Sequence, residues 1–150
     1  MFYNDVGDKM YKYYLFVIRE EVADIYSSNL KELYTILYEL QKGKFSNLNY
    51  RVSLFDQLCL PFKVNVISNY FKYLPHVSKN NQKYLYKFKS ETSLLVLRYP
   101  IIVIISNTKI PTFFNTLNLY NKKILICDFS SNNYFWLSKN NNNIRSLEYN

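Results

Sequence analysis

The residues best suited to chemistry are three acids near the start of the chain, Glu20, Glu21 and Asp24. Neighbouring carboxylates can serve as a general acid and a general base, but no second acidic cluster lies close to them in sequence. Acids are also common in the first turn of a helix, where they face the positive end of the helix dipole. We therefore interpret these residues as the start of a helix and not as a catalytic site.

Cysteine, histidine and glycine are too few and too scattered for the common catalytic and cofactor sites. Cys59 and Cys127 are far apart, and each stands in an apolar run, which predicts buried and unpaired thiols. His76 is the single histidine, so a Ser-His-Asp triad or a zinc site would lack its usual partners. With only Gly7 and Gly43, the chain has no glycine-rich phosphate loop. We expect a protein without catalysis, cofactor, metal or small-molecule substrate.

The formal net charge of +8 is distributed unevenly along the 150 residues. Residues 1–60 hold seven Lys or Arg against eight Asp or Glu, whereas residues 61–150 hold twelve against three. A basic C-terminal part can face nucleic acid, an anionic membrane or an acidic protein, although a solvated lysine-rich surface is the simpler interpretation. The 16 Tyr and many Asn and Lys fit an AT-rich genome, so their abundance alone does not indicate function.

The chain carries no evident targeting or membrane signal. Residues 1–10 lack the basic and apolar regions of a signal peptide. The longest apolar run, residues 94–105, is interrupted by Arg98 and Pro100 and is shorter than the roughly 20 residues that span a bilayer. We therefore expect a soluble, cytoplasmic protein with no membrane contact.

The elements that must position these residues follow from hydrophobic periodicity. Tyr11–Ile18 is rich in aromatic and β-branched residues, so it predicts a strand. The acids that follow predict a helix that breaks and restarts at Ser27–Asn29 and stops at Lys42–Gly43. Asn47–Tyr73 is expected to be mostly helical with Pro61 as a kink or boundary, and Pro75–Gln82 to be a polar loop.

The remaining segments predict a sheet. We expect strands and a short helix at Tyr84–Lys89, Thr92–Leu97, Ile101–Ser106, Pro111–Leu119 (the helix), Ile124–Asp128 and Tyr134–Leu137. This order favours a single-domain α/β sandwich over residues 1–150, with a mixed β-sheet, helices packed on it, and loose tails at 1–9 and 139–150. The residues expected to be mostly buried are Leu15, Val17, Leu95, Leu97, Ile102, Ile104, Leu125 and Phe129.

Two surfaces are candidates for binding. The helical stretch from Val22 to Tyr38 carries apolar residues over a wider arc than one core contact requires, so some of them are expected to reach the surface as a protein-binding patch. The simpler interpretation is that all of them lie in the core. The second candidate is the strand Tyr84–Lys89, where Tyr84, Tyr86 and Phe88 alternate with Lys87 and Lys89. Aromatic rings beside cations can stack on single-stranded bases, so nucleic-acid binding is the alternative function. A half-buried strand with one core face is the simpler interpretation of that pattern.

Two segments carry a family resemblance, Tyr13–Tyr26 near one end of the chain and Cys127–Leu137 near the other. They resemble the SirA family, the sporulation inhibitors of replication. Tyr13–Tyr26 is similar to the family's tyrosine-rich strand, its basic-Glu-Glu step and its first helix. Cys127–Phe129 and then Tyr134–Leu137 resemble its closing hairpin, with Phe135 in place of a small residue. The length of the chain and the order of its elements agree with the family as well.

The resemblance implies a regulator that binds the N-terminal domain of the replication initiator DnaA and blocks initiation as a cell commits to sporulation. The family's contact surface includes the first helix. Tyr26 matches an aromatic position on that surface, and Val22 matches another that is Phe in the family. We expect Val22 and Tyr26 at the centre of the contact, Ile25 beside them, and Glu21 among the charges at the rim.

Overall fold

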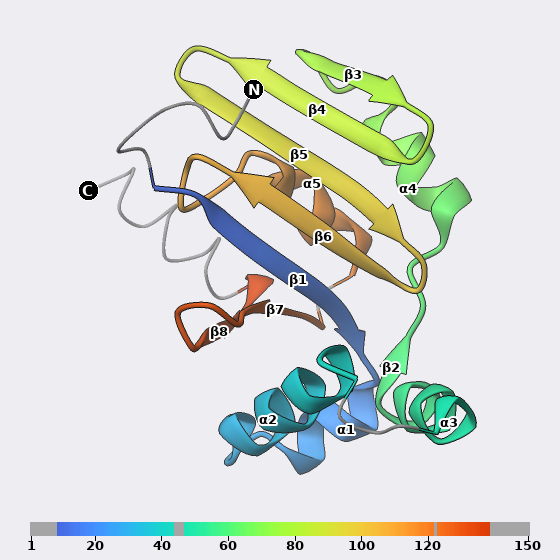
Figure 1. Ribbon diagram of the computed structural model, residues 1–150. Coiled ribbons are helices and arrows are strands. Elements are labelled where there is room, and N and C mark those ends of the chain that lie inside the picture. Colours follow the sequence, from blue (N-terminus) through green and yellow to red (C-terminus); the bar gives the residue numbers. More distant parts are fainter. Residues whose placement is uncertain (1–8, 44–46, 122, 139–150) are drawn as a thin grey trace.

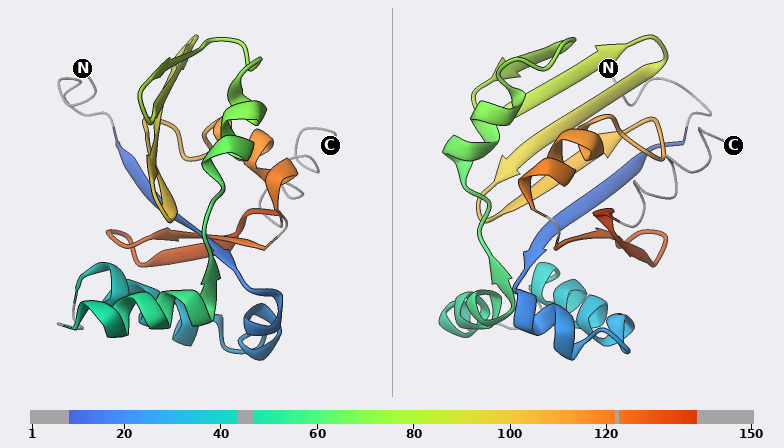
Figure 2. Two further views of the ribbon diagram at one scale, coloured as in Figure 1. Left: turned by 90° about the vertical axis from the view of Figure 1, so that its right-hand side faces the viewer. Right: turned by 180° about the vertical axis from the view of Figure 1, so that it is seen from behind.

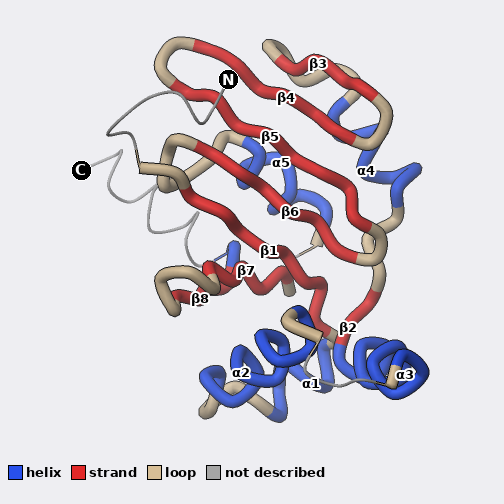
Figure 3. Tube along the Cα trace, in the orientation of Figure 1, coloured by secondary structure: helices blue, strands red, loops and turns tan. Residues whose placement is uncertain are grey.

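A computed structural model describes residues 9–43, 47–121 and 123–138 (Figures 1 and 3). Its helices are α1 (Glu20–Ile25), α2 (Leu30–Gln41), α3 (Leu48–Leu58), α4 (Val64–Phe71) and α5 (Phe113–Tyr120). Its strands are β1 (Tyr11–Ile18), β2 (Cys59–Leu60), β3 (Val77–Asn80), β4 (Lys83–Phe88), β5 (Glu91–Arg98), β6 (Ile101–Ser106), β7 (Ile124–Asp128) and β8 (Asn133–Trp136). The expected α/β fold class is confirmed.

The strands form one sheet in the order β3-β4-β5-β6-β1-β7-β8, and the short β2 pairs with the end of β1. Short turns join β4 to β5, β5 to β6 and β7 to β8, so consecutive strands run in opposite directions. The first strand, β1, lies between β6 and β7 and is antiparallel to both. The expectation of a mixed sheet was wrong, because every pair of described strands is antiparallel.

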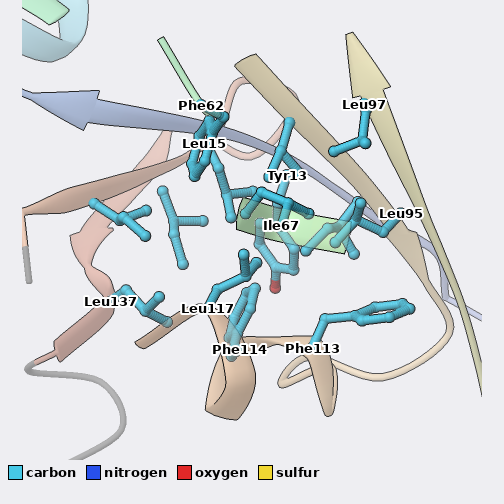
Figure 4. Close-up of a cluster of buried hydrophobic side chains, with 14 of the residues drawn as sticks. Tyr13, Leu15, Phe62, Ile67, Leu95, Leu97, Phe113, Phe114, Leu117 and Leu137 are labelled. Carbon is cyan, nitrogen blue, oxygen red and sulfur yellow. The ribbon is translucent and has the colours of Figure 1, made fainter. Parts of the chain in front are cut away.

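One face of the sheet packs against α4 and α5 (Figures 2 and 4). Alternate residues of β1, including Tyr13, Leu15 and Val17, point to this face because side chains alternate across a strand. They meet Phe113 and Phe114 of α5. The hydroxyl group of Tyr13 donates a hydrogen bond to the carbonyl oxygen of Lys109 at 2.8 Å, which satisfies the one polar atom of that buried ring.

The other residues of β1, among them Phe16 and Ile18, belong to a second core with α1, α2 and α3. These three helices form a layer at the end where β1 leaves the sheet (Figure 2). The last four residues of β1 are buried on both faces, as expected for a strand between two cores. Leu85 and Leu94, farther along the sheet, stay half-exposed.

Most expected elements are found, but two strands and the burial of one residue differ from the prediction. Pro75–Gln82 was expected to be a loop, but it contains the edge strand β3. The strand β2 was not foreseen after α3. Phe129 was expected to be buried, but it lies in a turn after β7 and is half-exposed, beside the rings of Tyr14 and Tyr34. The other seven residues expected in the core are buried.

The two cysteines are confirmed as free and buried. Burial raises the pKa of the Cys59 thiol to about 12 and raises that of Cys127 further. Within the described ranges, no group of three or more His, Cys, Asp or Glu side chains is placed to hold a metal ion.

Candidate protein-binding surface

The first helix, α1, begins directly after the last residue of β1. Arg19 occupies the N-cap position in an extended conformation and gives no side-chain cap. Glu20 and Glu21 fill the first turn, where their charges complement the unpaired N–H groups of the helix start. The helix ends after six residues, as expected from the polar Ser27–Asn29 that follows.

Three hydrogen bonds from the end of β1 fix where α1 begins. The backbone N–H of Ile18 donates to the carbonyl oxygen of Lys123 at 2.8 Å, and that of Arg19 donates to Leu58 at 3.0 Å. The Nε of Arg19 also donates to the carbonyl oxygen of Asp56 at 2.7 Å. Because the partners lie in α3 and before β7, distant segments of the chain set the position of the helix.

The inward face of α1 consists of Val22 and Ala23, which are buried in the second core. The expectation that Val22 projects into solvent was wrong, since only 7% of the residue is exposed. Neighbouring helix positions lie about 100° apart, so this adjacent pair defines one inward direction. Ile25 points away from that direction and is 72% exposed.

Tyr26 caps the C-terminal end of α1 and is half-exposed. Its ring packs at the edge of the second core, and its backbone N–H donates to the carbonyl oxygen of Val22 at 3.0 Å. The four predicted contact residues therefore separate. Ile25 and Glu21, one turn apart, are exposed; Tyr26 is shared between core and solvent; and Val22 lies beneath the surface.

The charges around Ile25 are negative. Glu20, Glu21 and Asp24 are all exposed on the same short helix, and its last turn carries no basic residue. An exposed aliphatic side chain ringed by carboxylates can serve as the centre of a contact whose polar rim meets a basic partner. The residues Glu21, Ile25 and Tyr26 are called the α1 patch below.

A groove beside α3 was not foreseen from the sequence. It has a volume of about 590 Å³ and is bounded by the end of α2, by α3 and by the turn between β5 and β6. On α3, Leu48 and Val52 are exposed toward it, although helical spacing alone assigns such residues to a core. The groove could not be found from the sequence, because its walls join residues from Phe16 to Ile101.

On β4, the aromatic residues of the alternative site do not form an exposed surface for stacking. Tyr84 and Tyr86 do share a face, as expected, but that face packs against α4 and α5, with Tyr84 at 5.2 Å from Phe71 between ring centroids. Phe88 is exposed, but the imidazole of His76 stacks on it at 3.9 Å. Burial of both tyrosines contradicts the alternative in which they stack on bases and confirms the simpler interpretation, a strand with one core face.

A family model described as "Sporulation inhibitor of replication protein SirA" matches residues 11–141. The match confirms the resemblance seen at both ends and extends it over the segments between them. A search of curated proteins found no match. In the described part of the chain, no helix is both long enough and apolar enough to cross a membrane.

Proposed function

The chain belongs to the SirA family of sporulation inhibitors of replication, and on this basis we propose that it regulates replication by binding the N-terminal domain of DnaA. In this proposal it acts by occupying its partner and carries out no reaction. Blocking that domain prevents the initiator from starting a new round of replication as the cell commits to sporulation.

The observation that carries the proposal is the presentation of the α1 patch. Ile25 is a large aliphatic residue held in solvent on a helix whose position is fixed by hydrogen bonds from β1 to α3 and to Lys123. A pre-positioned apolar side chain contributes more to binding than a mobile one, because less conformational freedom is lost on association. The acids beside it favour a basic partner surface and speed the encounter.

The roles within the contact differ from residue to residue. Ile25 and the exposed part of Tyr26 supply the apolar centre, and Glu21 supplies a charge at the rim. Val22 supports the helix from below, and its burial fixes the outward direction of Ile25. Val22 stands at a position that belongs to the family's contact surface. In this chain it therefore contributes to binding indirectly, by setting the orientation of α1.

Calorimetric titration of the purified protein with the N-terminal domain of the host's DnaA tests the proposal. We expect binding by the wild type and a loss of more than tenfold in affinity for Tyr26→Ala. Tyr73→Ala is the matched control, because Tyr73 is 83% exposed and lies far from the α1 patch. It follows α4, and the end of α4 next to β3 lies at the opposite end of the molecule from α1 (Figure 2).

Thermal unfolding must accompany the titration, because Tyr26 also touches the second core. A well-folded Tyr26→Ala protein with wild-type affinity would exclude the α1 patch as the contact. A wild type that does not bind the DnaA domain at all would refute the proposed partner. Binding to a single-stranded oligonucleotide that weakens steeply with salt would support the lysine-based alternative instead.

A further inference from the structure

The groove beside α3 combines apolar walls with two arginines. Its apolar lining includes Phe16 of β1, Leu40 of α2, Val52 and Phe55 of α3, and Pro100 of the turn between β5 and β6. Figure 1 shows that turn beside β2 and α3, at the right of the sheet. Arg51 of α3 and Arg98 at the end of β5 line the same space.

Arg51 is the more constrained of the two cations. Its Nε is buried, and no acceptor for it is found among the residues that the structure describes. Its Nη1 lies 3.6 Å from the point where a Cβ on Gly43 would stand, so the guanidinium packs against the chain at the end of α2. Because Nε has almost no exposed area, an acceptor in the groove would bind the Nη groups of Arg51, whose fork can hold two oxygens.

The charge of the groove favours an anion. Two arginines, Arg51 and Arg98, line the groove with one acidic residue, Asp56, which is exposed. The planar fork of a guanidinium matches paired oxygens of a carboxylate or a phosphate. A carboxylate brings less charge into a groove with mostly apolar walls, so it is the better match here. The volume of about 590 Å³ lies within the range of small-molecule sites.

We propose that this groove binds a small amphipathic carboxylate, with its carboxylate on Arg51 and Arg98 and its apolar body against Phe16, Leu40, Val52 and Phe55. The ligand is not a substrate, and no bond is made or broken. The proposal does not depend on the α1 patch or on DnaA, because the groove is a separate feature of the helical layer.

Titration with three probes separates the two halves of the proposed ligand. Octanoate carries both the carboxylate and the apolar body, 1-octanol lacks the charge, and acetate lacks the body. With amide chemical shifts of the labelled protein as the readout, octanoate should bind at least tenfold more tightly than 1-octanol, and acetate should not bind. The shifts should centre on the amides of Val52 and Ile101, which line the groove.

Substitutions then identify the groups that hold the anion. Arg51→Met keeps an unbranched apolar side chain and removes the charge, so octanoate should bind about tenfold more weakly while 1-octanol is unaffected. Arg98 is exposed, so Arg98→Met remains a valid test if the first variant does not fold. Lys109→Met is the matched control, because Lys109 lines a different cleft, near β4 and β6.

Three outcomes would overturn the proposal. The first is that octanoate fails to shift the groove amides, and the second is that it binds no more tightly than 1-octanol. The third is that a folded Arg51→Met or Arg98→Met protein binds octanoate as the wild type does.

Discussion

Two neighbouring positions on α1 allow binding to be separated from folding. Val22 is 7% exposed and Ile25 is 72% exposed, although they are three residues apart on the same short helix. Replacing each with Ala removes part of an aliphatic side chain from a different environment. Val22→Ala should destabilise the fold, and Ile25→Ala should weaken binding to the DnaA domain without that effect.

The expected magnitudes follow from these exposures. Burying an Ile side chain completely contributes about 1.5–3 kcal/mol, so a side chain that is 72% exposed can gain about 1–2 kcal/mol when a partner covers it. Ala keeps one of the four side-chain carbons, which leaves a loss of about 0.8–1.5 kcal/mol, or about four- to twelvefold in Kd. For Val22, two lost methyl groups and a small cavity cost about 2 kcal/mol of folding free energy.

The assays are calorimetric titration for the Kd and thermal unfolding for stability. A cost of 2 kcal/mol should lower the Tm of Val22→Ala by about 4–8 °C in a protein of this length. Ile25→Ala should change the unfolding free energy by no more than about 0.5 kcal/mol, as is usual at exposed positions. Wild-type affinity for Ile25→Ala, or an unchanged Tm for Val22→Ala, would refute the assigned orientation of α1.

Two further predictions concern buried polar groups. Burial holds the thiol pKa of Cys59 at about 12 and raises that of Cys127 further, so neither cysteine should react with a disulfide reagent at neutral pH until a denaturant is added; rapid reaction of the native protein would contradict their burial. Although burial alone would raise the pKa of Asp128, hydrogen bonds from Ser131 and Ser130 lower it below its ordinary value. Ionised Asp128 therefore stabilises the fold above its unfolded pKa of about 3.9, and this contribution is lost as the pH falls through the lowered folded pKa. Asp128→Asn should lower the urea midpoint of unfolding at pH 7. The difference between the midpoints of the variant and the wild type should become smaller in acid, and a difference that does not change with pH would contradict this assignment.

Local sequence was sufficient for the elements in which side-chain pattern and backbone agree. The aromatic and β-branched run of β1 and the acids after it mark a strand-to-helix step that the structure places at Arg19. The edge strand β3 has no such pattern. It is the polar sequence Val-Ser-Lys-Asn, mostly exposed, and is a strand because β4 supplies its hydrogen-bond partners. Polar edge strands also resist pairing with other chains.

The candidate site depended on information that local sequence does not hold. A six-residue helix has fewer than two turns, so its apolar positions do not settle which side faces the core. Val22, Ile25 and Tyr26 were expected to act together because they follow helical spacing. The second core accommodates Val22 and Ala23 together, and this leaves Ile25 outside.

The α1 patch is therefore a product of long-range contacts as much as of its own residues. The carbonyl oxygens of Asp56 and Leu58 accept hydrogen bonds from Arg19, and β2 pairs Cys59 with Ile18, so the segment from α3 to β2 fixes the last turn of chain before α1. A substitution in that segment can reorient Ile25 without touching any partner. A variant at residues 56–60 that weakens binding is therefore expected to act by displacing α1. It indicates a direct contact with the partner only if the orientation of α1 is unchanged.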